Sequence, residues 1–121
     1  MKLRILIADD HDMVRETLAM FLGADGTVQT TAAHDLPEAL AKMRSEGPFD
    51  LVLLDYSMPG MKGLDGLRTA IAAHGGNPVG LISGTASRLI ADQALEMGAA
   101  GFLPKTMSAK SLVNAVRFMA A

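Results

Sequence analysis

Three short runs of apolar residues along the chain lack polar alternation: residues 5–8 (ILIA), 51–54 (LVLL) and 79–82 (VGLI). Strands that are buried on both faces of a parallel sheet have this pattern, so the runs predict central strands. Two further stretches, 28–33 (VQTTAA) and 101–104 (GFLP), are more polar or shorter. They predict strands at the edges of the sheet.

Between these runs, apolar residues recur at the three- and four-residue spacing of amphipathic helices. Asp35 with Glu38 forms a capping-box signature, Ser87 and Ser108 are candidate N-caps, and the glycines at 75–76 and 98 mark helix ends. Five helical patterns follow the five strands in turn: Val14, Leu18, Phe21 and Leu22; Leu36, Ala39, Leu40 and Met43; Leu64, Leu67 and Ile71; Ile90, Ala94 and Met97; Leu112, Ala115, Val116 and Met119.

Strict alternation of strands and helices predicts an α/β fold with helices on both faces of a parallel sheet. A doubly wound five-stranded sheet in the order 2-1-3-4-5, with five helices in a flavodoxin-like arrangement, puts the three most apolar runs in the centre. The chain has 121 residues, of which 50% are hydrophobic, enough for a single core. We therefore expect one domain over residues 1–121.

Composition limits the environment and the partners. The net charge of −2 and the absence of a basic run argue against direct binding to DNA or to a membrane surface. The chain has no cysteine, and its N-terminal apolar run is interrupted by Arg4 and stopped by Asp9, too early for a signal peptide or a membrane span. We expect a cytoplasmic protein.

Polar side chains follow the central strands. Asp9 and Asp10 follow the first run, Asp55 the second, Ser83 the third, and Lys105 follows the last strand. In a doubly wound sheet these positions meet at one edge, where ligands bind. Three carboxylates suit Mg²⁺, a lysine and a serine suit the oxygens of a phosphoryl group, and aspartate is a competent nucleophile for phosphorus. His11 is interpreted as a loop histidine without a ligand role.

The segments ILIADDHDMVRETL, LVLLDYSMPGMKGLDGL, LISGTAS and GAAGFLPK together resemble the receiver domains of bacterial two-component response regulators, over essentially the whole chain. The resemblance implies that Asp55 accepts a phosphoryl group from a sensor histidine kinase. It implies further that Asp10, Asp55 and the backbone carbonyl of Ser57 bind Mg²⁺, with Asp9 holding the ion through water. Ser83 and Lys105 would contact the phosphoryl oxygens.

The resemblance also gives Phe102, three residues before Lys105, as the aromatic switch residue that acts with Ser83. Many receivers have Tyr at this position, and Phe cannot donate a hydroxyl hydrogen bond. Many also have proline after the active-site lysine, where this chain has Thr106, so a cis peptide bond there is less favoured.

The wording of the motifs is most similar to regulators with a C-terminal helix-turn-helix DNA-binding domain, which this sequence does not include. We therefore expect a regulatory phosphoacceptor domain, not an enzyme, that controls transcription through such a domain and contacts DNA only through it. A stand-alone receiver in a phosphorelay is the alternative. Val113, Phe118 and Met119 in the last helical pattern can form a homodimer face, dock another domain or pack on the sheet.

Two other classes of protein are alternative interpretations of the sequence: a phosphatase and an interaction module. Residues 10–14 fit the DxDxV pattern of haloacid dehalogenase-like phosphatases, but those enzymes need an acidic motif after the lysine, and no Asp or Glu follows Glu96. The second is an interaction module with a degenerate site, although no acceptor, metal-binding or lysine position is missing. Catalytic, as opposed to stoichiometric, release of phosphate from acetyl phosphate would distinguish a phosphatase from a receiver.

Overall fold

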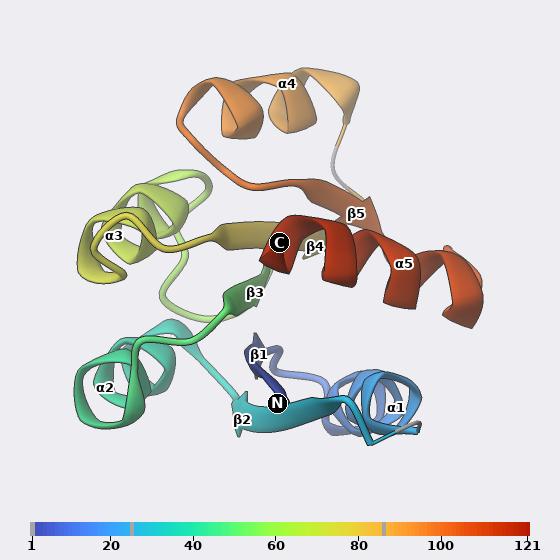
Figure 1. Ribbon diagram of the computed structural model, residues 1–121. Helices are drawn as coiled ribbons and strands as arrows, with labels where there is room; N and C mark the ends of the chain where they lie inside the picture. The colour runs from blue at the N-terminus through green and yellow to red at the C-terminus, as the bar shows by residue number, and fades with distance from the viewer. Residues whose placement is uncertain (1, 25, 86) are drawn as a thin grey trace.

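The computed structural model describes residues 2–24, 26–85 and 87–121, and its centre is a five-stranded parallel sheet (Figure 1). The strand order is β2-β1-β3-β4-β5, as the sequence predicts. The strands are β1 (Leu3–Ala8), β2 (Val28–Ala33), β3 (Leu51–Asp55), β4 (Val79–Ser83) and β5 (Phe102–Pro104).

Helices cover both faces of the sheet (Figure 1). They are α1 (Asp12–Gly23), α2 (Leu36–Glu46), α3 (Asp65–Ala73), α4 (Arg88–Glu96) and α5 (Ala109–Ala120). Figure 1 shows α1 and α5 on one side of the sheet and α2, α3 and α4 on the other. The fold is therefore the doubly wound α/β arrangement expected from the alternation of patterns.

Two apolar clusters fill the space between the sheet and its helices, because neighbouring strand residues point to opposite faces. Leu6, Val52 and Leu54 belong to the cluster under α2, α3 and α4. Ile5, Leu53 and Ile82 belong to the one under α1 and α5. The central strands are thus buried on both faces, which explains why their sequences lack polar alternation.

Most of the helix boundaries follow from local capping. Asp35 accepts a hydrogen bond from the backbone N–H of Glu38, Ser87 from that of Ile90 and Ser108 from that of Ser111. The capping box at α2 is only half formed, because the Glu38 carboxylate accepts from the N–H of His34 and not from that of Asp35. The predicted N-caps are confirmed.

Several boundaries differ from the sequence prediction by one or two residues. β1 begins at Leu3, since the backbone N–H of Leu3 already bonds to the carbonyl of Thr27. Met97 lies just beyond α4 as its C-cap. Asp55 and Ser83 are the last residues of their strands and not the first residues of loops, because strand pairing continues to them.

The structure places the last helix, the peptide bond after Lys105 and the segment LISGTAS as follows. Met119 is buried on the sheet, whereas Phe118 of the same helix is 82% exposed. The peptide bond between Lys105 and Thr106 is trans. Ala86, within the LISGTAS segment, lies outside the described residues.

Candidate functional site

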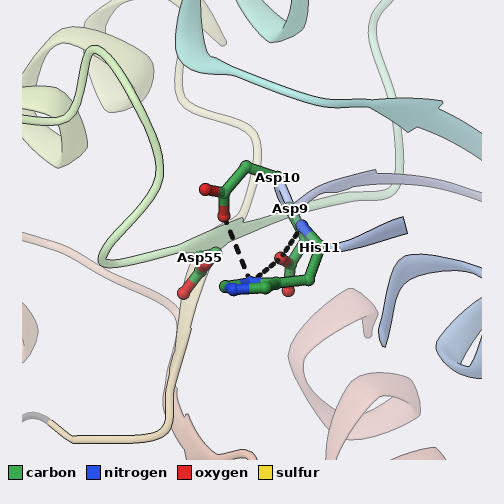
Figure 2. A group of neighbouring side chains, drawn as sticks. All are labelled: Asp9, Asp10, His11 and Asp55. Carbon is green, nitrogen blue, oxygen red and sulfur yellow. Dashed lines mark hydrogen bonds and ion pairs between the residues drawn. The ribbon is translucent and has the colours of Figure 1, made fainter. Parts of the chain in front are cut away.

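The acidic residues after β1 and β3 meet at the carboxyl edge of the sheet (Figure 2). Parallel pairing of β1 with β3 sets Ala8 opposite Leu54, so that Asp9 and Asp55 follow at the same level. One ligand atom from each of Asp9, Asp10, His11 and Asp55 can be chosen so that all four lie within 4.8 Å of one another. Three carboxylates are therefore gathered in one small volume, two of them buried.

Lys105, the residue after β5, reaches this cluster at the same edge of the sheet. Its Nζ lies 3.0 Å from Oδ2 of Asp9 and 3.3 Å from Oδ2 of Asp55. Both aspartates are buried, so this ammonium is the cation that faces the two Oδ2 atoms. One ammonium group thus offsets part of the charge of three carboxylates, and the site keeps an excess of negative charge.

Burial and the neighbouring charges shift the pKa values of Asp55 and Lys105. Burial raises the pKa of Asp55, the charge of Asp9 raises it further, and the Ser57 N–H and Lys105 oppose these effects only in part. For Lys105, burial lowers the pKa, but the hydrogen bond to Asp9 and the charges of Asp55 and Asp9 together raise it above its ordinary value. The lysine is accordingly held as a cation between the carboxylates.

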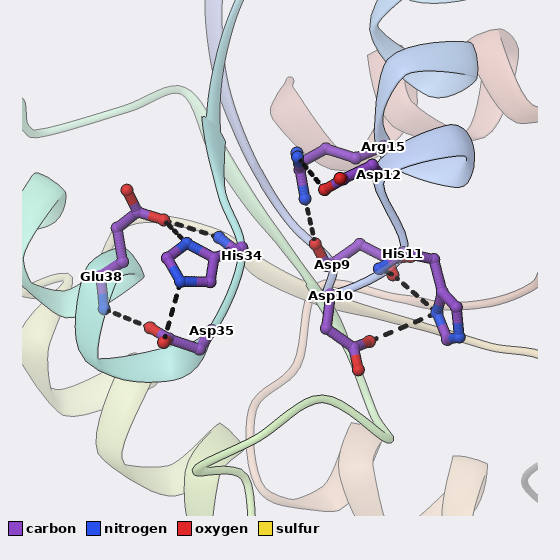
Figure 3. A network of polar contacts seen from close by, with 8 residues as sticks. All are labelled: Asp9, Asp10, His11, Asp12, Arg15, His34, Asp35 and Glu38. Atoms are coloured by element: carbon purple, nitrogen blue, oxygen red, sulfur yellow. Dashed lines mark hydrogen bonds and ion pairs between the residues drawn. The ribbon is translucent and has the colours of Figure 1, made fainter.

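His11 lies within the cluster. Its Nδ1 is 3.2 Å from Oδ1 of Asp9 and 3.3 Å from Oδ1 of Asp10, and its backbone N–H donates to Oδ1 of Asp9 at 2.8 Å (Figures 2 and 3). The sequence predicts a loop residue, and His11 does lie in the turn between β1 and α1. That turn directs the imidazole toward both carboxylates, and the absence of a ligand role stays a prediction.

The donor set fits a hard divalent cation. Carboxylate oxygens are the ligands that Mg²⁺ prefers, and it is commonly bound by one or two of them together with phosphate oxygens and water. Burial of carboxylate oxygens is unfavourable unless cations or donors face them, and the buried Oδ2 atoms of Asp9 and Asp55 share the single ammonium of Lys105. A divalent cation in the cluster would offset the remaining negative charge.

The three other predicted site residues are Ser83, Ser57 and Phe102. Ser83 is buried at the end of β4, next to the strand that ends in Asp55, and its Oγ accepts from the backbone N–H of Thr85 at 3.2 Å. Ser57 donates its N–H to Oδ1 of Asp55 at 3.3 Å. Phe102 on β5 pairs with Leu81 on β4, and its ring is partly buried against the core cluster under α2, α3 and α4.

Arg15 contributes to the site although the sequence analysis did not select it. Its guanidinium donates to the backbone carbonyl of Asp9 at 2.7 Å and pairs with Asp12 at 2.6 Å (Figure 3). The side chain therefore fixes the backbone of the Asp9–Asp10 turn to the first turns of α1. The i, i+3 pair of Asp12 and Arg15 is visible in the sequence, but the contact with Asp9 depends on how α1 leaves the sheet.

Fold and site together define a flavodoxin-like α/β protein with an acidic site at the switch point between β1 and β3. Residues 5–117 match the family model of the response regulator receiver domain. The chain belongs to this family, and so it is a receiver domain of the kind found in two-component response regulators.

Similar proteins include a probable transcriptional regulatory protein and a response regulator. The chain is 39% identical over 119 residues to the probable transcriptional regulatory protein NarL of Mycobacterium tuberculosis, covering 95% of this chain and 53% of that protein. It is 32% identical over 118 residues to the response regulator GacA of Pseudomonas protegens, covering 97% of this chain and 55% of that protein. The chain spans about half the length of these relatives.

Solved structures agree with the family. The signal receiver domain of NarL from Mycobacterium tuberculosis superposes with a TM-score of 0.87 at 37% identity, covering 98% of this chain and 96% of that one. A LuxR-family response regulator from Aurantimonas superposes with a TM-score of 0.88 at 27% identity, covering 99% and 86%. Among the described residues, no helix is long and apolar enough to cross a membrane.

Proposed function

We propose that residues 1–121 form one receiver domain that acts as a phosphorylation-dependent switch, with Asp55 as the acceptor and a sensor histidine kinase as the donor. The observation that carries the proposal is the position of the Lys105 ammonium, within 3.3 Å of carboxylate oxygens on both Asp9 and Asp55. A lysine held beside a buried aspartate provides a point charge for the oxygens of a phosphoryl group on that aspartate.

Asp10, Asp55 and the backbone carbonyl of Ser57 would hold Mg²⁺ directly, with Asp9 acting through water. The hard oxygen donors and the excess negative charge of the cluster support this assignment. When bound, the ion supplies positive charge that neutralises the oxygens of the transferred group.

The transfer itself is a displacement at phosphorus. A carboxylate oxygen of Asp55 forms the new P–O bond as the P–N bond to the imidazole of the kinase histidine breaks, and the electron pair of that bond leaves with the imidazole. Lys105 and Ser83 contact the phosphoryl oxygens, the first as a charge and the second as a hydrogen-bond donor. Hydrolysis ends the signal: a water oxygen forms the new P–O bond as the bond between phosphorus and the Asp55 oxygen breaks, which returns the Asp55 carboxylate and inorganic phosphate. The domain would therefore regulate and would not be a dedicated enzyme.

The switch would start at Ser83. Its hydroxyl accepts the Thr85 N–H at the end of the strand next to the one that ends in Asp55, and rotation of this hydroxyl would let it donate to a phosphoryl oxygen on Asp55. The loop from β4 to α4 would follow that rotation, and the partly buried ring of Phe102 would move inward. The surface of α4, β5 and α5 is then the part of the domain that changes with phosphorylation.

An apolar groove beside the site suits a protein donor. It has a volume of about 280 Å³ and lies between α1 and the segment that leads into α5. Lys105 lines one part of the groove, and Met13, Phe21 and Met107 line others. An apolar helix face of the kinase seated there would bring its phosphohistidine next to Asp55.

The output that the relatives support is control of transcription. The relatives named above are called transcriptional regulatory protein and response regulator, and this chain spans about half their length. We propose that the domain controls a C-terminal DNA-binding domain and contacts DNA only through it. Membership of the receiver family argues against the haloacid dehalogenase-like phosphatase.

The test is phosphorylation by acetyl phosphate with Mg²⁺, followed by intact-mass measurement. The wild-type domain should gain one phosphoryl group, and Asp55→Asn should gain none. Asp50→Asn, which changes an aspartate outside the cluster, is the control and should be labelled like the wild type. Full labelling of Asp55→Asn would contradict the assignment of the acceptor.

A further inference from the structure

We propose that His11 is a direct ligand in the cation site and gives this site a preference for late first-row divalent ions, such as Ni²⁺, Co²⁺ and Zn²⁺, over Mg²⁺. The observation behind the proposal is that the Nδ1 atom of His11 lies close to the carboxylates of Asp9 and Asp10, within a cluster that also contains Asp55 (Figure 2). It rests on the cation site of the proposed function, and it adds a nitrogen donor to a set of oxygen donors.

The distances match those between neighbouring ligands of one ion. Two atoms bound at about 2.1 Å to the same ion lie about 3.0 Å apart at a right angle and about 3.4 Å apart at the tetrahedral angle. Nδ1 of His11 is 3.2 Å from the Asp9 oxygen and 3.3 Å from the Asp10 oxygen, between these two values. The imidazole nitrogen therefore already has the spacing from each of the two carboxylates that neighbouring ligands of one ion have.

The buried carboxylates supply an independent reason for an ion at this position. The buried Oδ2 atoms of Asp9 and Asp55 share one ammonium, that of Lys105, at 3.0 and 3.3 Å. Asp10 adds a third carboxylate to the same cluster. An ion bound by His11 and these carboxylates would relieve that imbalance. It would leave coordination positions for the Ser57 carbonyl and for one phosphate oxygen.

The backbone of the turn keeps the imidazole in position. The N–H of His11 donates to Oδ1 of Asp9 at 2.8 Å, and Arg15 binds the carbonyl of Asp9 at 2.7 Å. The ring does not have to be recruited from solvent, even though its side chain is 63% exposed. Little conformational entropy is then lost on binding an ion.

Imidazole changes the selectivity of the site because of its chemistry. Mg²⁺ takes oxygen ligands almost exclusively, whereas nitrogen donors favour Co²⁺, Ni²⁺, Cu²⁺ and Zn²⁺ in the Irving–Williams order. His11 should therefore contribute strongly to the affinity for Ni²⁺ and little to the affinity for Mg²⁺. The same imidazole acting only as a hydrogen-bond donor to the carboxylates would affect both ions in the same direction.

The experiment is calorimetric titration of Mg²⁺ and Ni²⁺ into the wild-type domain, His11→Phe and His34→Phe at one neutral pH. His34 is the matched control, because its side chain is 64% exposed, pairs with two carboxylates and lies outside the cluster. We expect His11→Phe to weaken Ni²⁺ binding about tenfold or more. Mg²⁺ binding should change little, and His34→Phe should leave the cluster's Ni²⁺ affinity unchanged.

A second measurement detects the ligand directly. Co²⁺ bound to the wild-type domain should give a strongly shifted, exchangeable imidazole N–H resonance in the proton NMR spectrum, which His11→Phe removes. Equal changes in Mg²⁺ and Ni²⁺ affinity, or Ni²⁺ binding that survives His11→Phe together with an absent shifted resonance, would overturn the role of His11. The proposed function fails separately, through an absence of Mg²⁺ binding and of phosphate on Asp55 in the wild-type domain.

Discussion

The ammonium of Lys105 lies 3.3 Å from Oδ2 of Asp55, although the two residues are 50 positions apart in the chain. The contact joins the ends of β3 and β5, which do not pair with each other and are separated by β4. It brings the proposed acceptor and the cation that would face its phosphoryl group within ion-pair distance before any ligand binds.

The first prediction concerns this lysine. Lys105→Met should destabilise the metal-free domain, because it leaves the buried carboxylates of Asp9 and Asp55 without their cation. Breaking a fully buried pair costs about 3–5 kcal/mol, and the partial exposure of Lys105 reduces our expectation to about 1–3 kcal/mol. Urea unfolding with a chelator measures the effect. Lys110→Met, an exposed lysine on α5, should change the midpoint little.

The second prediction concerns Asp10 and Mg²⁺. An ion that binds only the folded state at 100 times its Kd stabilises the fold by about 2.7 kcal/mol. Asp10→Ala should abolish the Mg²⁺-dependent rise in Tm and should slightly raise the Tm without metal, since it relieves repulsion between carboxylates. Asp92→Ala removes an exposed carboxylate on α4, outside the cluster, and should keep the rise. A shift that persists in Asp10→Ala would place the ion elsewhere.

The third prediction concerns acid stability and Glu38. The backbone N–H of His34 is the main cause that holds the pKa of Glu38 below its ordinary value of 4.5. A lowered folded-state pKa gives stability that is present above pH 4.5 and is lost as the pH falls through the folded-state pKa.

Glu38→Gln keeps the acceptor oxygen but has no charge to titrate. Its stability should therefore decline less steeply below pH 4.5 than that of the wild type, as measured by urea midpoints across acid pH. Glu16→Gln, on the exposed surface of α1, is the control. Parallel curves for the wild type and Glu38→Gln would show that this contact does not contribute to acid sensitivity.

The fourth prediction concerns the loop after Asp55. A Cβ atom at Gly66 would lie 2.7 Å from both Cα and the carbonyl oxygen of Met61, and the Gly66 N–H bonds to that oxygen at 2.6 Å. Gly66→Ala should destabilise the domain by about 1–3 kcal/mol, because backbone atoms must move apart. At Gly23 on α1 the nearest atom is 3.8 Å from such a Cβ. Gly23→Ala should be neutral or stabilising in the same thermal melts.

The fifth prediction concerns the switch. Beryllofluoride with Mg²⁺, as a mimic of the phosphoryl group on Asp55, should shift the backbone NMR resonances of α4, β5 and α5. In Ser83→Ala the mimic should still bind, with much smaller shifts in these elements. Because Phe102 has no hydroxyl to satisfy, its inward rotamer should also be present as a minor state of the free domain, which relaxation dispersion can detect. Equal shifts in both proteins would show that Ser83 does not transmit the signal.

Hydrophobic periodicity determined the architecture. Runs such as residues 5–8 and 51–54 lack polar alternation because both faces of the central strands are buried, and this constraint acts on each residue separately. Caps such as Asp35 and Ser108 are equally local, since the side chain bonds to an N–H three residues away. The topology, the caps and the candidate residues at the carboxyl edge were therefore available from the sequence alone.

The tertiary structure decided how those candidates face one another. The sequence gives the order of residues after β1, but the direction of His11 depends on the turn that the Asp9 carboxylate and Arg15 hold. The approach of Lys105 to Asp9 and Asp55 likewise depends on the packing and twist of the four strands β1, β3, β4 and β5. The local sequence pattern indicates which side chains are buried and which ones cap helices. The whole fold sets the distances between groups that are far apart in the chain, and these distances determine which ions the site can hold.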